Sequence, residues 1–188
     1  MNKIALVTGA TSGIGKATAQ ILAKNNYKII LCGRREDRLL ELKNELSAYT
    51  EVHILSFDVR DKKAVFDSIY SLPEQFSKID VLINNAGNAH GLDPIQNGNL
   101  DDWDAMIDSN VKGLLYVSKA IIPKMIERKS GHIINIGSIA GKEVYPNGNV
   151  YCASKHAVDA LNQSMRMDLN PYGIRVGAIH PGMVETEF

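Results

Sequence analysis

Short apolar runs alternate with longer amphipathic stretches along the chain. The runs at residues 4–7, 28–32, 52–56, 81–84, 132–136 and 175–180 are rich in β-branched residues and predict strands. The stretches at residues 13–25, 35–48, 61–72, 100–129 and 150–169 have helical periodicity, and Pro123 is expected to interrupt the fourth. This alternation predicts a parallel sheet with crossover helices on both faces, which is a doubly wound α/β fold.

The predicted helix over residues 100–129 carries more apolar side chains than one sheet-facing stripe requires. They cover most of its circumference: Trp103, Met106, Ile107, Leu114, Leu115, Val117, Ile121, Ile122 and Met125. A second buried face is therefore expected. It is either covered within the subunit or forms an interface between copies of the chain, and the excess favours the interface, in a homodimer or homotetramer.

Composition and charge narrow the class of protein. A chain of 188 residues has room for one well-buried core, so a single domain over residues 1–188 is expected. The 21 basic and 21 acidic side chains cancel, which argues against nucleic acid or an anionic membrane as a partner. The first predicted strand starts at Ile4, too early for a signal peptide, and no apolar stretch is long enough to span a membrane. Cys32 and Cys152 lack metal-site spacing, so we expect no metal, two reduced thiols and a cytoplasmic location.

A glycine-rich turn follows the first predicted strand and opens the first predicted helix. Glycines at such a turn let a pyrophosphate approach the backbone, and the helix N-terminus adds partial positive charge and free N–H donors. The alternative is a tight turn that merely packs the helix closely on the strand. The candidate cofactor contacts of a Rossmann fold here are Gly9, Thr11, Ser12, Gly13, Ile14 and Gly15.

The end of the second predicted strand distinguishes between nicotinamide cofactors. An acid at this place would hydrogen-bond the ribose hydroxyls of NAD, but the chain has Arg34 and Arg35. Two guanidinium groups suit the 2′-phosphate of NADP, and Arg34, nearer the strand end, is the stronger candidate. The alternative is a solvated start of the next helix. The sequence favours NADP.

Polar residues also follow the third and fourth predicted strands, at the carboxyl ends where doubly wound sheets bind ligands. Asp58 could accept a hydrogen bond from an adenine amino group. Of Asn84 and Asn85, we expect at least one to hold the turn through backbone bonds and the other to line the cofactor cleft. The candidate contacts here are Asp58, Val59, Asn85, Ala86 and Gly87.

Tyr151 and Lys155 stand four residues apart at the start of the last predicted helix and so share one helical face. A phenol is a poor base at neutral pH unless a cation favours the phenolate, and Lys155 is expected to supply that cation. Ser138, after the fifth predicted strand, could donate to a substrate oxygen as negative charge develops there. This spacing often arises by chance, so the inference depends on Ser138 and the glycine turn preceding it.

Taken together, these motifs resemble the short-chain dehydrogenase/reductase family over essentially the whole chain. The matching positions are residues 8–15, Asp58, residues 84–87, Asn110, Ser138, Tyr151, Lys155, Pro181 and Gly182. The resemblance implies a catalytic tetrad of Asn110, Ser138, Tyr151 and Lys155. In it, Ser138 and Tyr151 bind the substrate oxygen, Asn110 holds a water linked to the lysine, and Lys155 also holds the nicotinamide ribose.

The segment from His180 to Thr186 is expected to close over the nicotinamide. Its candidate cofactor contacts are Pro181, Gly182, Val184 and Thr186. His180 itself is expected to fill the strand end rather than act as an acid or base. Family members continue beyond position 188 into a substrate-covering segment, a helix and a seventh strand, so the printed sequence is expected to lack the substrate lid and the last strand.

Within the family, four stretches are most similar to NADP-dependent 3-hydroxy acid dehydrogenases, which include serine 3-dehydrogenases: residues 33–35, 132–141, 151–155 and 181–188. The similarity implies hydride transfer between NADP and a small 3-hydroxy acid such as serine or allo-threonine, or the corresponding carbonyl compound. Two alternatives stay open. One is NADPH-dependent reduction of another small ketone or aldehyde, and the other is a catalytically idle nucleotide-binding module.

Overall fold

The computed structural model describes residues 2–187, so Met1 and Phe188, which belong to the terminal stretches discussed above, lie outside the described residues. Within residues 2–187, six strands form one parallel sheet in the order β3-β2-β1-β4-β5-β6. The strands are β1 (Ile4–Thr8), β2 (Lys28–Gly33), β3 (Val52–Ser56), β4 (Val81–Asn84), β5 (Gly131–Ile136) and β6 (Ile174–Ile179). The predicted doubly wound sheet is confirmed.

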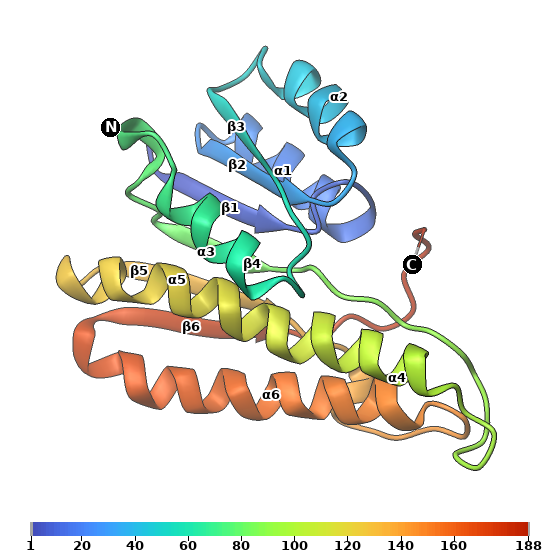
Figure 1. The fold of residues 1–188 in the computed structure, drawn as a ribbon. Coiled ribbons are helices and arrows are strands. Elements are labelled where there is room, and N and C mark those ends of the chain that lie inside the picture. The colour runs from blue at the N-terminus through green and yellow to red at the C-terminus, as the bar shows by residue number, and fades with distance from the viewer. Residues whose placement is uncertain (1, 188) are drawn as a thin grey trace.

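Helices connect successive strands and cover both faces of the sheet (Figure 1). They are α1 (Gly13–Lys24), α2 (Glu36–Leu46), α3 (Lys62–Tyr70), α4 (Leu100–Ile107), α5 (Leu114–Glu127) and α6 (Asn149–Leu169). Short 3-10 turns lie at Glu74–Phe76, Ile139–Gly141 and Asn170–Tyr172. No helix in the described part of the chain is both long and apolar enough to cross a membrane.

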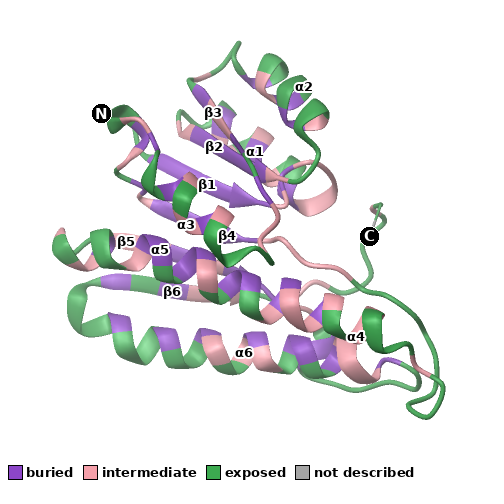
Figure 2. Ribbon diagram, viewed as in Figure 1, coloured by how far each residue is buried: buried purple, intermediate pink, exposed green. Residues whose placement is uncertain are grey.

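Alternate side chains of each central strand enter two separate cores. Leu6 and Ile30 pack with side chains of α3, α5 and α6, whereas Val7 and Leu31 pack with those of α1 and α2. Figure 2 shows the buried residues concentrated along the strands and on the inward faces of the helices. Burial on both faces explains why these strands are apolar throughout rather than alternating with polar residues.

The long helix predicted over residues 100–129 is interrupted, but the predicted place of the interruption, Pro123, is wrong. A π segment, Asp108–Gly113, separates α4 from α5, and Pro123 lies inside α5. Tertiary contacts accompany the wider turn: the Ser109 hydroxyl donates to Asn88 Oδ1 at 2.8 Å, and Asn110 Nδ2 donates to the Asn88 carbonyl at 2.9 Å. Such π segments frequently occur at functional sites.

Much of the broad apolar surface of α4 and α5 is covered within the subunit. Met106, Val117, Ile121 and Met125 are at most 2% exposed. Leu100 and Leu115 remain 68% and 38% exposed. Among the large apolar side chains of α4 and α5, these two are the exposed ones.

Candidate active site

The glycine turn closes tightly between β1 and α1. Gly9 and Gly13 have φ angles of +63° and +51°, backbone angles that residues other than glycine adopt only at a cost in free energy. A Cβ added to Gly15 would lie 2.3 Å from the carbonyl oxygen of Gly9, so the helix can sit this close only without a side chain there. The turn therefore presents bare backbone at the N-terminus of α1.

Asn85 joins this turn to the end of β4. Its Nδ2 donates to the carbonyl oxygens of Thr8 and Gly9 at 3.0 and 3.1 Å. The Thr8 hydroxyl oxygen accepts from the backbone N–H groups of Asn85 and Ala86, both at 3.0 Å. The prediction that one of the two asparagines holds the turn is confirmed for Asn85.

Asn84 does not line a cleft, so that part of the expectation is wrong. It is 4% exposed, and its Nδ2 donates to Ser118 Oγ and Asn135 Oδ1, both at 2.9 Å. Asn135 in turn donates to Asn162 Oδ1 of α6 at 3.0 Å. Asn84, the last residue of β4, faces this interior network, while Asn85, just after the strand, faces the turn.

The arginines after β2 lie differently from the expectation. Arg34 was the stronger candidate from the sequence, but its side chain is 64% exposed and its guanidinium lies 3.8 Å from Asp58. Arg35 Nη2 instead extends over the glycine turn and donates to Thr11 Oγ1 at 2.9 Å and Ser12 Oγ at 3.1 Å. Of the two arginines, Arg35 is the one that contacts the glycine turn.

Arg38, which the sequence did not single out as a site residue, forms an anion-binding pair with Arg35. Arg38, in the first turn of α2, lies 2.6 Å from the Glu187 carboxylate, and Arg35 binds the same carboxylate at 3.2 Å. Two hydrogen bonds lower the pKa of the Glu187 carboxyl group, the larger effect coming from Arg38 and the smaller from Arg35. The pair thus holds an anionic group directly beside the glycine turn.

Asp58 follows β3 as expected, but its carboxylate is engaged by Arg60. Arg60 donates to it through Nε and Nη2, the shortest contact being 2.7 Å. Burial raises the pKa of Asp58, but the hydrogen bonds from Arg60 and the charges of Arg60 and Arg34 outweigh it, so the net pKa is lowered. Val59 packs on the π segment, where a Cβ added to Gly113 would come within 2.7 Å of it.

The structure brings Ser138, Tyr151 and Lys155 together beyond the ends of β4 and β5. Lys155 Nζ lies 5.8 Å from the centre of the Tyr151 ring and donates to the carbonyl oxygen of Ile136 at 3.1 Å. Tyr151 shares a side-chain hydrogen bond with Ser138. Ser138 Oγ also accepts from the Ala140 N–H at 3.1 Å, which fixes its rotamer at the start of the 3-10 turn.

Burial dominates the electrostatics of this cluster. It raises the pKa of Tyr151 and outweighs the hydrogen bond to Ser138, which lowers it. The expected lowering of the phenol pKa by Lys155 is therefore not what the structure gives. Burial also lowers the pKa of Lys155 to about 8.

Asn110 lies behind the lysine, fixed by its own hydrogen bonds. It is 2% exposed, and its side chain accepts from the Asn88 N–H at 2.8 Å and donates to Ser154 Oγ at 3.0 Å. A Cβ added to Gly87 would lie 2.9 Å from Asn110 Oδ1 and 3.8 Å from Lys155 Nζ. Gly87 thus occupies the gap between these two predicted tetrad residues.

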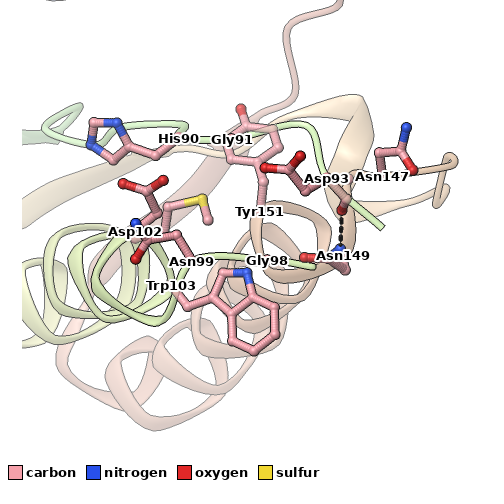
Figure 3. A pocket seen from close by; sticks show the side chains of 12 residues that line it. His90, Gly91, Asp93, Gly98, Asn99, Asp102, Trp103, Asn147, Asn149 and Tyr151 are labelled. Carbon is pink, nitrogen blue, oxygen red and sulfur yellow. Dashed lines mark hydrogen bonds between the residues drawn. The ribbon is translucent and has the colours of Figure 1, made fainter. Parts of the chain in front are cut away.

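A hollow of about 260 Å³ opens next to Tyr151. Figure 3 shows Tyr151 between His90 and Asp102 on one side and Asp93 and Asn149 on the other. The sequence predicted none of the other lining residues as site residues; they lie in α4, at the start of α6 and in the loops before these two helices. The wall comprises His90, Gly91, Asp93, Gly98, Asn99, Asp102, Trp103, Met106, Asn147, Gly148 and Asn149.

The segment after β6 runs from the Ser138 turn to the glycine turn. The Pro181 carbonyl oxygen accepts from the Ile139 N–H at 3.0 Å, and a Cβ added to Gly13 would lie 3.1 Å from Thr186. Gly182 and Val184 lie between these two contacts, and Val184 is 52% exposed. Within residues 2–187, no group of three or more His, Cys, Asp or Glu side chains could hold a metal ion.

Comparisons with known proteins agree on one family. The family model described as short chain dehydrogenase matches residues 3–188. Sulfoacetaldehyde reductase 2 of Chromohalobacter salexigens is 48% identical over 189 residues, which span 100% of this chain and 75% of that protein. NADP-dependent 3-hydroxy acid dehydrogenase YdfG of Escherichia coli is 46% identical over 98% of this chain and 74% of its own length. The closed form of serine dehydrogenase complexed with NADP+ superposes with a TM-score of 0.95 at 45% identity, covering 98% of this chain and 74% of that chain.

Proposed function

The chain belongs to the short-chain dehydrogenase family, and from this premise we propose that it is an NADP-dependent oxidoreductase acting on a small hydroxy acid or the corresponding carbonyl compound. The observation that carries the proposal is the cluster of Ser138, Tyr151 and Lys155 beside the glycine turn. The named relatives support the same reading, since YdfG acts with NADP and the serine dehydrogenase structure contains NADP+.

The residues present fit a phosphorylated dinucleotide. The glycine turn leaves bare backbone at a helix N-terminus, as a pyrophosphate requires. Arg35 and Arg38 already hold a carboxylate next to it, so the same two guanidinium groups would hold the 2′-phosphate. The remaining proposed cofactor contacts are Gly9, Thr11, Ser12, Ile14, Arg34, Asp58, Val59, Asn85, Ala86, Gly87, Pro181, Gly182, Val184 and Thr186.

When bound, NADP supplies or accepts the hydride that is exchanged with the substrate carbon. The chain supplies the placement of the substrate oxygen and a path for its proton. Ser138 holds that oxygen by a hydrogen bond, and Tyr151 takes its proton during oxidation or returns it during reduction. Lys155, whose Nζ lies 5.8 Å from the centre of the Tyr151 ring, would hold the nicotinamide ribose next to the phenol. Asn110 would hold a water molecule that is linked to Lys155 and continues the proton path.

Replacing Tyr151 by Phe tests the reaction. The variant keeps the ring but lacks the hydroxyl, so kcat should fall about 10²-fold to 10⁴-fold, the usual contribution of a general acid or base. NADPH absorbance follows turnover, and Tyr172→Phe, an exposed tyrosine after α6, serves as the control. Unchanged turnover in Tyr151→Phe would show that the proton takes another route, and nucleotide binding without any turnover in the wild type would favour the idle module.

A second substrate class has a specific observation in its favour. The 48% identical relative is named a sulfoacetaldehyde reductase, and sulfoacetaldehyde is a small aldehyde with an acidic group. Both directions can be profiled with purified protein: serine, allo-threonine and 3-hydroxy acids with NADP+, and sulfoacetaldehyde and simple ketones with NADPH. Turnover of the aldehyde together with inertness toward serine and 3-hydroxy acids would replace the first substrate class by the second.

We also propose that the enzyme works as a homo-oligomer, a dimer or tetramer, in the cytoplasm. The support for self-association is the exposed apolar surface at Leu100 and Leu115 on α4 and α5. A small-molecule alcohol or carbonyl compound is its partner in the reaction.

A further inference from the structure

His180, just past the end of β6, has more contacts than a strand-end filler needs. Its Nδ1 lies 3.2 Å from the main-chain carbonyl oxygen of Ser138, and its Nε2 lies 3.3 Å from Asp159 Oδ1 of α6. A Cβ added to Gly137 would lie 2.6 Å from Nδ1, so the ring packs directly on the backbone that precedes Ser138. The imidazole thus fills the space between α6 and the Ser138 turn.

The chemistry of the two partners decides which form of the ring fits. A main-chain carbonyl oxygen and a carboxylate both accept hydrogen bonds and donate none. A neutral imidazole has one N–H and can donate to one of them. A protonated imidazole has two N–H groups and can donate to both, so the ring makes its full set of contacts as the cation.

Asp159 connects this ring to the helix that carries the reaction. It lies four residues after Lys155 in α6, and its Oδ2 accepts from Lys142 Nζ at 2.7 Å and from Gln163 Nε2 at 2.8 Å. The hydrogen bond from Lys142 lowers the pKa of Asp159, which keeps the carboxylate ionised. The charged groups at the ring are thus Asp159 and, through it, Lys142 from the turn after Ser138.

Two backbone bonds hold the same turn against the end of β6. The Gly137 N–H donates to the Ile179 carbonyl at 2.8 Å, and the Ile139 N–H donates to the Pro181 carbonyl at 3.0 Å. The His180 ring adds a third tie, at the carbonyl of Ser138 itself. Like the ion pair of Lys142 with Asp159, this third tie connects the turn to α6, the helix that carries Tyr151.

We propose that His180 is a positioning residue: held between Asp159 and the Ser138 carbonyl, its ring sets the Ser138 hydroxyl at the correct distance from Tyr151. The proposal rests on the proposed function, because it concerns the same serine and tyrosine. It assigns His180 no contact with substrate or cofactor. Its effect is on kcat, through the geometry of Ser138.

The first test compares His180→Ala, Asp159→Asn and the double variant. Each single change should lower kcat about tenfold while NADP affinity stays within about twofold, since positioning affects the transition state more than cofactor binding. The double variant should lose no more kcat than the less active single variant, because the two residues act through one series of hydrogen bonds. Gln163→Ala, which removes another hydrogen bond to the same carboxylate, is the matched control and should retain wild-type kcat.

The second test uses His180→Gln, a replacement whose side-chain amide can still donate a hydrogen bond. His180→Gln should recover part of the kcat that His180→Ala loses, because its amide can still donate to the Ser138 carbonyl oxygen or to Asp159. Circular dichroism and the midpoint of thermal unfolding confirm that each variant is folded. A purely structural role would change stability without a matching loss and recovery of kcat.

The outcomes separate this inference from the proposed function. A wild-type protein without turnover would overturn the proposed function. An active wild type with equally active His180→Ala and His180→Gln variants would overturn the positioning role alone. Additive losses in the double variant, or a His180→Gln variant no more active than His180→Ala, would also contradict it.

Discussion

Lys155 is a buried cation whose position has a measurable effect on stability. It is 6% exposed, and burial lowers its pKa to about 8. The folded chain therefore holds this proton less tightly than the unfolded chain does. Between about pH 8 and the usual lysine range the unfolded chain binds more protons, so this residue makes the free energy of unfolding rise with pH there. Below pH 8 the full cost of burying the charge is present.

Replacing Lys155 by Met should accordingly stabilise the fold at neutral pH. The buried charge costs up to ~3 kcal/mol, from which the lost hydrogen bond to Ile136 must be subtracted. The gain over wild type should shrink as pH rises from about 8 to about 10, because the folded chain then carries this lysine uncharged. Urea unfolding at neutral pH and at about pH 10 measures this gain in stability. Lys119→Met, which replaces an exposed lysine of α5, is the control. A variant that is destabilised equally at both pH values would show that burial of the charge costs little.

Arg35 carries the second prediction at this scale. Arg35→Ala should weaken NADP binding about tenfold to a hundredfold and leave NAD affinity nearly unchanged, because a charged hydrogen bond to the 2′-phosphate is lost. Arg34→Ala should have the smaller effect, since the Arg34 side chain is 64% exposed and its guanidinium lies 3.8 Å from Asp58. Isothermal titration with both nucleotides measures this, and Arg166→Ala on the exposed side of α6 is the control. Equal wild-type affinity for NAD and NADP would contradict the arginine assignment.

Spacing in the sequence predicted which residues gather at the site, but not what each of them contacts. Tyr151 and Lys155 share a face because helical geometry guarantees it. Asn84 and Asn85 are neighbours in the chain, yet one is bonded in the interior and the other at the glycine turn. The direction of the Tyr151 pKa depends on burial, which follows from packing of distant segments and is not contained in the local pattern.

At the scale of elements, the π segment shows most clearly what a local pattern leaves out. The strands and five helical stretches follow from periodicity, since each buries a continuous apolar face. The interruption at Asp108–Gly113 instead accompanies contacts of Ser109 and Asn110 with Asn88, a residue of the loop after β4. Pro123 removes one N–H donor but leaves α5 continuous, so proline was the wrong signal for this break.

The glycine turn gives a test at the same scale. Gly15→Ala would place a Cβ 2.3 Å from the Gly9 carbonyl oxygen and 2.5 Å from Asn85 Nδ2, so β1, α1 and β4 would have to move apart. We expect a loss of about 2–4 kcal/mol in stability and loss of nucleotide binding. Gly177→Ala in β6 is the matched control, because an added Cβ there has no neighbour within 4 Å. Thermal unfolding with and without NADP measures both effects, and a Gly15→Ala protein as stable as the control would contradict the close approach.

At the scale of the whole molecule, exposed apolar side chains on α4 and α5 allow self-association to be tested. Leu115→Lys places a charge on that surface and should shift the mass seen by light scattering toward the monomer. Leu40→Lys changes a similarly exposed leucine, 44% accessible in α2, and should leave the mass unchanged. A monomeric wild type would rule out self-association. An oligomer whose mass is unchanged by Leu115→Lys would place the interface elsewhere.

The strand order has a consequence for how the chain can fold while it is being synthesised. β1 emerges first, β2 pairs with one of its edges and β3 pairs with β2; β4 then pairs with the other edge of β1, β5 with β4 and β6 with β5. In the described chain, each newly emerged strand therefore meets a free edge that is already waiting, and the sheet can grow outward from its oldest strand. Domains fold from the N-terminus during synthesis at rates that allow such stepwise addition. The glycine turn would thus be in place before the ribosome has made the tyrosine that works beside it.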